Sequence, residues 1–190
     1  MTKRLQLIVM ALLASMAGMA QVDAHYGVGA VPVVNNRVTF EKTIPLPAGQ
    51  DGKETFEKAV KWMEGRFVTP TVISCKIVTQ DDMNAVRIVQ AEEWIVFRRR
   101  WWELDRSRIT YLLEMTSGEK GLTLRMTRIR YLYEEERGGG QRYTAEEWIT
   151  DDECFNDTKT KFLRSSGKFR IKTIDLFDQL VSEVEKAVKN

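Results

Sequence analysis

The sequence predicts an α+β fold in which one antiparallel sheet of about five strands carries two helices, in the order β-α-β-β-β-β-α. Apolar and polar residues alternate through most of residues 71–133, as they do in strands that bury one face. On either side of this region, residues 50–67 and 173–190 repeat apolar positions at helical spacing. We therefore expect one helix in the N-terminal half and one at the C-terminus, both packed on the sheet.

The first strand and the first helix have clear local signals. Residues 37–46, RVTFEKTIPL, place four apolar side chains on one parity, and two prolines end the strand. The helix is expected to begin after Asp51, a possible N-cap with Glu54 three residues on, and to stop at Gly65. Its apolar stripe consists of Phe56, Ala59, Val60 and Met63.

The other four strands are expected to form two hairpins. The first hairpin turns at residues 81–84, between TVISCKIVTQ and AVRIVQAEEWIVFRR. The second turns at residues 117–121, between RITYLLEM and LTLRMTRIRYLYEE. Beyond Met126 the apolar parity shifts by one residue, which predicts a β-bulge near Thr127 or Arg128.

The last third of the chain gives a weaker pattern. Residues 134–141, EEERGGGQ, are typical of an exposed flexible loop, and residues 142–172 show no clear periodicity. The final helix is expected behind a cap from Thr173 or Asp175. Its apolar stripe consists of Phe177, Leu180, Val181, Val184 and Val188.

The first 20 residues have the features of a secretory signal peptide. Lys3 and Arg4 precede an apolar stretch over residues 7–14, and small residues follow it. The stretch is shorter than the ~20 residues of a membrane span, although an uncleaved N-terminal anchor is the alternative. Cleavage is expected after Ala20 or as late as Ala24.

These features predict an exported protein that is periplasmic, outer-membrane-associated or secreted, with no transmembrane span once the leader is removed. Residues 21–36 would form a flexible N-terminal segment, and residues 37–190 a single α+β domain.

The charge of the mature chain gives no electrostatic reason to expect nucleic acid as a partner. The leader contains two of the 29 basic residues and none of the 27 acidic ones, so the rest of the chain is nearly neutral.

Two cysteines, Cys75 and Cys154, could form a disulfide in an oxidising compartment. The alternative is a pair of buried or half-buried free thiols, because Cys75 shares its strand parity with Ile73 and Ile77.

Three segments carry a resemblance to a known family: VPVVNNRVTFEKTI, ETFEKAVKWMEGRF and ITYLLEMTSGEKGLTLRMTRIRYLYE. Over about residues 31–135, the chain resembles the exported Bacteroidetes domain of unknown function 4468 family, whose fold is like that of the TATA-binding protein. The resemblance implies a fold and an exported location, but no activity, cofactor or catalytic residue. The fold does not imply DNA binding, because function depends on sites. VFRRRWWELDRSR is more basic and aromatic than the family pattern.

The pentapeptide AEEWI occurs twice, at residues 91–95 and 145–149. The flanks of the two copies differ, so we interpret the repeat as coincidence. Both copies are compatible with strands, in which Glu and Trp alternate between the faces. Glu92 and Glu93 would then point to opposite sides and could not form the facing pair of a glycosidase. A site built from one glutamate of each copy remains the enzymatic alternative.

The strongest candidate for a binding site is the cluster of Arg98, Arg99, Arg100, Trp101 and Trp102. Guanidinium groups beside indoles suit an anionic glycan, a lipid phosphate or the acidic face of an envelope protein. The alternative is an edge strand that runs into a loop, with half-buried tryptophans and with arginines paired to nearby acids. Those acids are Glu92, Glu93, Glu103 and Asp105.

Most catalytic and metal-binding motifs are missing from the sequence. His25 is the only histidine, which argues against zinc sites and Ser-His-Asp triads. The glycines at 138–140 lack the lysine of a phosphate loop, and the acidic residues 151–153 lack EF-hand spacing. We therefore expect a non-enzymatic binding or structural domain of the cell envelope, without cofactor or metal. A hydrolase that uses Asp and Glu alone and a structural subunit of an envelope assembly are the alternatives.

Overall fold

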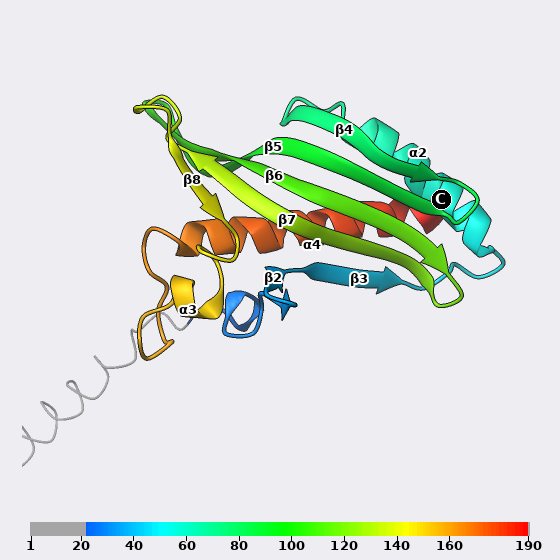
Figure 1. Ribbon diagram of the computed structural model, residues 1–190, viewed down its shortest axis with the longest axis horizontal. Coiled ribbons are helices and arrows are strands. Elements are labelled where there is room, and N and C mark those ends of the chain that lie inside the picture. Colours follow the sequence, from blue (N-terminus) through cyan, green and yellow to red (C-terminus); the bar gives the residue numbers. More distant parts are fainter. Residues whose placement is uncertain (1–21, 190) are drawn as a thin grey trace, which may run out of the picture.

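One antiparallel sheet and two long helices make up most of the structure (Figure 1). This computed structural model describes residues 22–189, and the expected signal peptide lies outside them. The strand order is β3-β7-β6-β5-β4, and β8 pairs with the far end of β7. The strands are β3 (Phe40–Ile44), β4 (Val72–Asp81), β5 (Val86–Arg100), β6 (Glu103–Gly118), β7 (Gly121–Tyr133) and β8 (Gln141–Thr144). Outside this sheet, β1 (Val33–Val34) pairs with β2 (Arg37–Val38).

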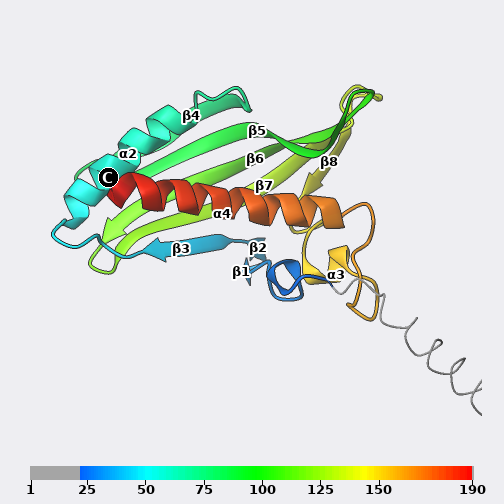
Figure 2. The same cartoon turned by 180° about the vertical axis from the view of Figure 1, so that it is seen from behind.

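Both long helices lie on one face of the sheet, α2 (Gly52–Arg66) beside the C-terminal half of α4 (Gly167–Lys189) (Figure 2). The expected α+β class and helix placement are confirmed. Burial follows the predicted alternation, because every second residue of β6 from Ile109 to Met115 is fully buried and the residues between are half-buried. Within residues 22–189, no helix is both long and apolar enough to cross a membrane.

Local sequence signals fixed several elements. The Asp51 side chain accepts a hydrogen bond from the Glu54 amide at 2.8 Å and caps α2, which ends at Arg66, one residue beyond the expected stop. The register of β6 and β7 shifts between Thr110 and Leu112, and Arg128 has φ 53°, so the predicted bulge is confirmed. Gly121 has φ 131°, and an added Cβ would collide with the carbonyl of Ile44.

The prediction that Cys75 lies on a buried strand face was wrong. β4 is an edge strand, so Cys75 is exposed, and its same-parity neighbour Ile77 is 53% exposed. Cys154 is buried in the short helix α3 (Asp151–Cys154), and both cysteines are free thiols. The possible disulfide is therefore not formed in this structure.

The C-terminal helix begins at Gly167, earlier than the expected cap. Thr173 lies inside the helix and is fully buried, and its hydroxyl lies 2.8 Å from the Phe169 carbonyl and 2.7 Å from the Tyr131 hydroxyl. The expected apolar stripe is confirmed, since Leu180, Val184 and Val188 are fully buried. The first turns of α4 contain polar residues that make tertiary contacts, as Thr173 does, so no apolar periodicity marked them in the sequence.

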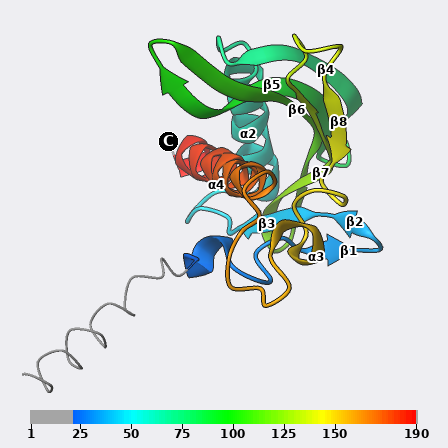
Figure 3. The same ribbon diagram turned by 90° about the vertical axis from the view of Figure 1, so that its left-hand side faces the viewer.

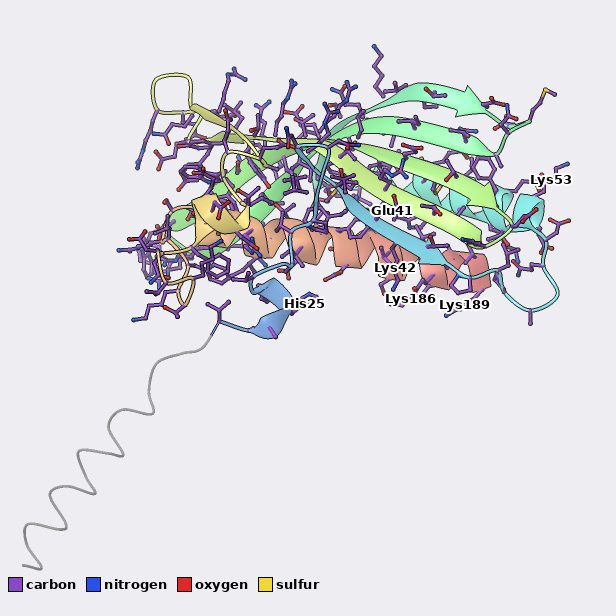
Figure 4. The ribbon with its side chains drawn as sticks, turned by 60° about the horizontal axis from the view of Figure 1, so that its bottom comes forward. His25, Glu41, Lys42, Lys53, Lys186 and Lys189 are labelled. Atoms are coloured by element: carbon purple, nitrogen blue, oxygen red, sulfur yellow. The ribbon has the colours of Figure 1, made fainter. Side chains whose placement is uncertain are left out.

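The N-terminal segment, expected to be flexible, is instead docked on α4. Its short helix η2 (Ala24–Tyr26) places the Tyr26 hydroxyl 2.7 Å from Asp175. His25 lies beside α4, with its Nε2 2.7 Å from Asp178 (Figure 4). This contact explains why the only histidine of the chain is held in place rather than lying on a free tail.

Arg170 holds the N-terminal segment against α4. Its side chain is fully buried, and its guanidinium donates to the carbonyls of Tyr26 (2.8 Å), Gly27 and Ile149 (2.7 Å). The same group forms an ion pair with Asp151 at 2.8 Å. One buried cation thus joins α4 to the N-terminal segment and to the turn before α3.

Replacement of Arg170 by Met should lower the free energy of unfolding by about 3 kcal/mol, because it leaves three carbonyls and Asp151 without their cation. Urea unfolding of the protein without residues 1–20 measures the loss. Arg137→Met, at a side chain that is 78% exposed, is the control and should change stability by less than ~0.5 kcal/mol. Equal stability of the two variants would contradict the role of Arg170.

The two thiols should differ in reactivity, because Cys75 is exposed and Cys154 is 0% exposed. In the native reduced protein, a chromogenic disulfide reagent should modify one thiol quickly and the second only after unfolding. Cys75→Ser should remove the fast phase, and Cys154→Ala should leave it. Two thiols that react at the same rate would show that the placement of these residues is wrong.

Candidate ligand-binding cleft

The predicted arginine and tryptophan cluster forms the tip of the β5–β6 hairpin. Trp101 and Trp102 are 91% and 60% exposed, and their rings meet edge to face at 4.9 Å. The Arg100 guanidinium carbon lies 5.7 Å from the Trp102 ring. The tip therefore presents aromatic and cationic groups directly to solvent.

The alternative arrangement, with the arginines neutralised by nearby acids, is formed only at Arg98, which lies 3.5 Å from Glu103. The other three acids have different partners. Glu92 pairs with Arg108, Glu93 with Arg66, and Asp105 with Lys168. Most of the cationic charge of the tip is thus left without an ion pair among residues 22–189.

A cleft of about 890 Å³ opens at the base of this hairpin. It lies beside the last residues of β5 and β7 and the first residues of β6 and β8, together with the first turn of α4 and the loop before that helix. Arg98 of the predicted cluster lines the cleft, whereas the other four residues of the cluster do not. The aromatic lining of the cleft consists of Phe97, Tyr133, Tyr143, Trp148 and Phe169.

Two of these rings stack face to face and form one flat wall, in which each ring keeps only its outer face uncovered by the other. Tyr143 and Trp148 stack with centroids 3.9 Å apart and an angle of 12° between their planes. Trp148 comes from the second AEEWI, which forms a turn after β8, so the expectation of a second strand there was wrong. The amide of Ile149 bonds to the Ala145 carbonyl at 2.9 Å and closes this turn.

A break in the strand pairing brings Phe97 into the cleft. The register of β5 and β6 shifts between Val96 and Arg98, and the Phe97 ring packs 4.6 Å from that of Phe169. A β-bulge of this kind redirects a side chain at the end of a strand.

Lys168 supplies a fixed cation inside the cleft. Its Nζ lies 2.7 Å from the Tyr133 hydroxyl and 2.9 Å from Asp105, and it stands 4.5 Å from the Phe97 ring centroid. Burial works to lower the pKa of Lys168, but the hydrogen bonds to Tyr133 and Asp105 outweigh it and raise the pKa. Burial also raises the pKa of Tyr133, against the opposing effect of Lys168. Both groups therefore stay protonated at neutral pH.

The glutamates of the two AEEWI copies do not meet. Glu93 is buried and binds Arg66 at 2.8 Å and the Tyr111 hydroxyl. Glu146 accepts the Val38 amide at 2.8 Å, and Glu147 accepts the Thr144 hydroxyl at 2.8 Å. Each carboxylate serves a separate structural contact.

Two of the acidic residues 151–153 are also engaged with the protein. Asp151 pairs with Arg170, and Asp152 pairs with Lys159, each at 2.8 Å. Residues 22–189 contain no group of three or more His, Cys, Asp or Glu side chains placed to hold a metal ion.

A second groove of about 940 Å³ lies between α2 and the β4–β5 turn. Its lining mixes apolar groups with lysines and glutamates, and it contains no stacked aromatic pair. The hairpin cleft is the stronger candidate, because only there do a flat aromatic wall and several cations converge.

Sequence reasoning identified Arg98 but missed most of the cleft. Tyr143, Trp148 and Lys168 all come from residues 142–172, where no periodic pattern was visible. The one local signal was the tryptophan of the second AEEWI, which lies in a segment that we interpreted as compatible with a strand.

Comparisons with known proteins point to one family. The model of the domain of unknown function DUF4468 with TBP-like fold matches residues 40–132. The crystal structure of a DUF4468 family protein from Bacteroides ovatus is 34% identical, with a TM-score of 0.80 over 88% of this chain and 95% of that one. A TBP-like protein from Parabacteroides distasonis is 17% identical, with a TM-score of 0.67 over 84% and 97%, and is similar in fold alone. No curated protein matches the sequence.

Iodide should quench the tryptophan fluorescence of the native protein more strongly than caesium, because the exposed indoles lie among arginines that attract anions. Stern–Volmer plots for the two ions measure the difference. Trp101→Phe with Trp102→Phe should remove most of the quenching by iodide. Arg99→Gln with Arg100→Gln should reduce the difference between quenching by iodide and quenching by caesium. Stronger quenching by caesium would contradict the cationic surroundings of the tip.

Proposed function

The chain belongs to the DUF4468 family and has its TBP-like fold, and from that premise we propose that it is an exported, non-enzymatic binding protein whose hairpin cleft takes an anionic glycan. The family description gives a fold and no activity, so the proposal rests on the cleft itself. The observation that carries it is the meeting of a stacked Tyr143–Trp148 wall with Lys168, Arg98 and Arg164 around one cavity.

The size and lining of the cleft suit a small ring-bearing ligand. Ligand sites typically enclose about 300–1,000 Å³, with mostly apolar walls and a few polar groups that fix orientation. A flat aromatic wall offers its face to the C–H side of a sugar ring, and its amphipathic rings tolerate a partly hydrated partner. The stacked pair is thus the expected platform for a sugar.

The charged groups of the cleft favour a sugar that carries an acidic group. Lys168 presents an ammonium held by Asp105 and Tyr133, and Arg98 and Arg164 line the exposed part of the cleft, where Glu103 lies 3.5 Å from Arg98. The lining thus contains three cations and two carboxylates, a small excess of positive charge. Arginine binds carboxylate and sulfate-like groups through paired N–H donors. A glycan that carries uronic acid, sulfate or phosphate meets these requirements better than a neutral one.

A binding role fits the protonation of the cleft better than acid–base catalysis. The raised pKa of Lys168 and of Tyr133 favours donation of hydrogen bonds to an anion and disfavours proton abstraction. Export is supported by the signal-peptide pattern of residues 1–20 and leaves the periplasm, the outer-membrane surface or the medium as the site of action.

Calorimetric titration of the leader-free protein with matched acidic and neutral oligosaccharides tests the proposal. Acidic glycans should bind more tightly, and Trp148→Ala should weaken binding about tenfold through loss of the stacked wall. Arg164→Gln should weaken binding to acidic glycans alone and increase the relative affinity for neutral ones.

Met83→Ala and Lys61→Gln, both in the groove beside α2, are the controls and should bind like the parent protein. Equal affinity for acidic and neutral glycans, or unchanged affinity in Trp148→Ala, would refute the proposal.

A further inference from the structure

The tip of the β5–β6 hairpin projects from the body of the domain (Figure 3). Besides Trp101 and Trp102, it exposes 47% of Leu104, and Leu163 on the neighbouring loop is 43% exposed. Single exposed apolar side chains are common on protein surfaces, whereas a cluster of them marks an interaction site, and here four of them lie at one end of the molecule. The glycan cleft does not account for the two indoles, which lie outside its lining.

The charge of the tip indicates the chemistry of the partner. Residues 98–106 contain four arginines and two carboxylates, and one of those carboxylates, Asp105, is held by Lys168. Arg99 and Arg100 form no ion pair within residues 22–189, whereas many arginines of the sheet, such as Arg108 and Arg125, do. A partner that covers the tip must therefore supply negative charge beside an apolar or amphipathic layer.

We propose that this tip is a membrane-docking loop, which places Trp101 and Trp102 in the headgroup region of an anionic bilayer while the arginines bind lipid phosphates. Indoles favour the boundary between headgroups and hydrocarbon, because the ring is apolar and its N–H needs a polar partner. Arginine binds phosphate through paired donors and stays charged there.

The two signals are needed together. A short apolar insertion or a small basic patch gives weak membrane binding alone, and the combination gives stable but reversible attachment. Each basic residue near an anionic surface adds about fivefold to partitioning. Two tryptophans and three adjacent arginines on a projecting turn combine the two signals in five consecutive residues.

Vesicle co-sedimentation of the leader-free protein tests this assignment. The protein should bind vesicles that contain about one-third phosphatidylglycerol and should bind pure phosphatidylcholine at least ~25-fold less, with binding that falls as salt rises. Its tryptophan emission should shift to shorter wavelength, and brominated lipid should quench it.

Two double variants separate the apolar from the electrostatic contribution. Trp101→Ser with Trp102→Ser should reduce partitioning at least tenfold and abolish the emission shift. Arg99→Gln with Arg100→Gln should reduce binding to anionic vesicles by roughly 25-fold and leave the weak binding to phosphatidylcholine unchanged. All four side chains are exposed, so both variants should keep the fold.

Matched controls come from the opposite end of the domain. Met83→Ser removes an apolar side chain that is 97% exposed at the β4–β5 turn. Lys186→Gln with Lys189→Gln removes two exposed cations from the last turn of α4 (Figure 4). Both controls should bind vesicles like the parent protein.

The assignment relies on the proposed export but not on the glycan cleft, and the two can fail separately. Trp148→Ala should lose glycan affinity and keep vesicle binding, and the tip variants should show the reverse. Absence of binding to anionic vesicles, equal binding to neutral ones, or tip variants that bind like the controls would overturn it.

Discussion

The buried guanidinium of Arg170 is the constraint on which the geometry of the cleft depends. A cation removed from water is tolerated only where its donors are satisfied, so the surrounding backbone must bring carbonyls to it. One of those carbonyls belongs to Ile149, next to Trp148, and Arg170 itself lies two residues from Lys168. The aromatic wall and the cleft cation are therefore held at a fixed spacing by a contact that a ligand would not touch.

A second buried ion pair sets the position of the helices over the sheet. Arg66 of α2 binds Glu93 of β5 at 2.8 Å and Glu183 of α4 at 3.1 Å, and Tyr111 of β6 donates to Glu93. From this contact, the seven residues of β5 to Arg100 extend about 23 Å at ~3.3 Å each, and the 16 residues of α4 back to Gly167 extend about 24 Å at ~1.5 Å each. The first turn of α4 therefore reaches the end of β5, where Lys168 and Phe169 line the cleft at the base of the hairpin.

The features that the sequence predicted correctly are those set by neighbours along the chain. The Asp51 cap, the bulge at Arg128 and the stripe of α4 each follow from a pattern within a few residues. The failures depend on contacts between distant segments. Cys75 is exposed because β4 lies at the edge of the sheet. The alternation of residues within one strand does not indicate the position of that strand in the sheet. The docking of the N-terminal segment depends on Arg170, an arginine whose complete burial no local pattern predicts.

The near-neutral charge of residues 21–190 gave no reason to expect nucleic acid as a partner, yet the structure separates the charges of the domain by location. At physiological salt, charges more than about 8 Å apart in solvent are largely screened from one another. Acids paired within the sheet, such as Glu41 with Arg125, therefore do little to the potential at the hairpin tip. What a partner meets there is set by Arg99, Arg100 and the two indoles beside them, and by the cations of the cleft. Net charge thus gives little information about binding by this domain. Its longest strands carry arginines, unpaired within residues 22–189, on a hairpin tip that projects away from the acids of the rest of the domain.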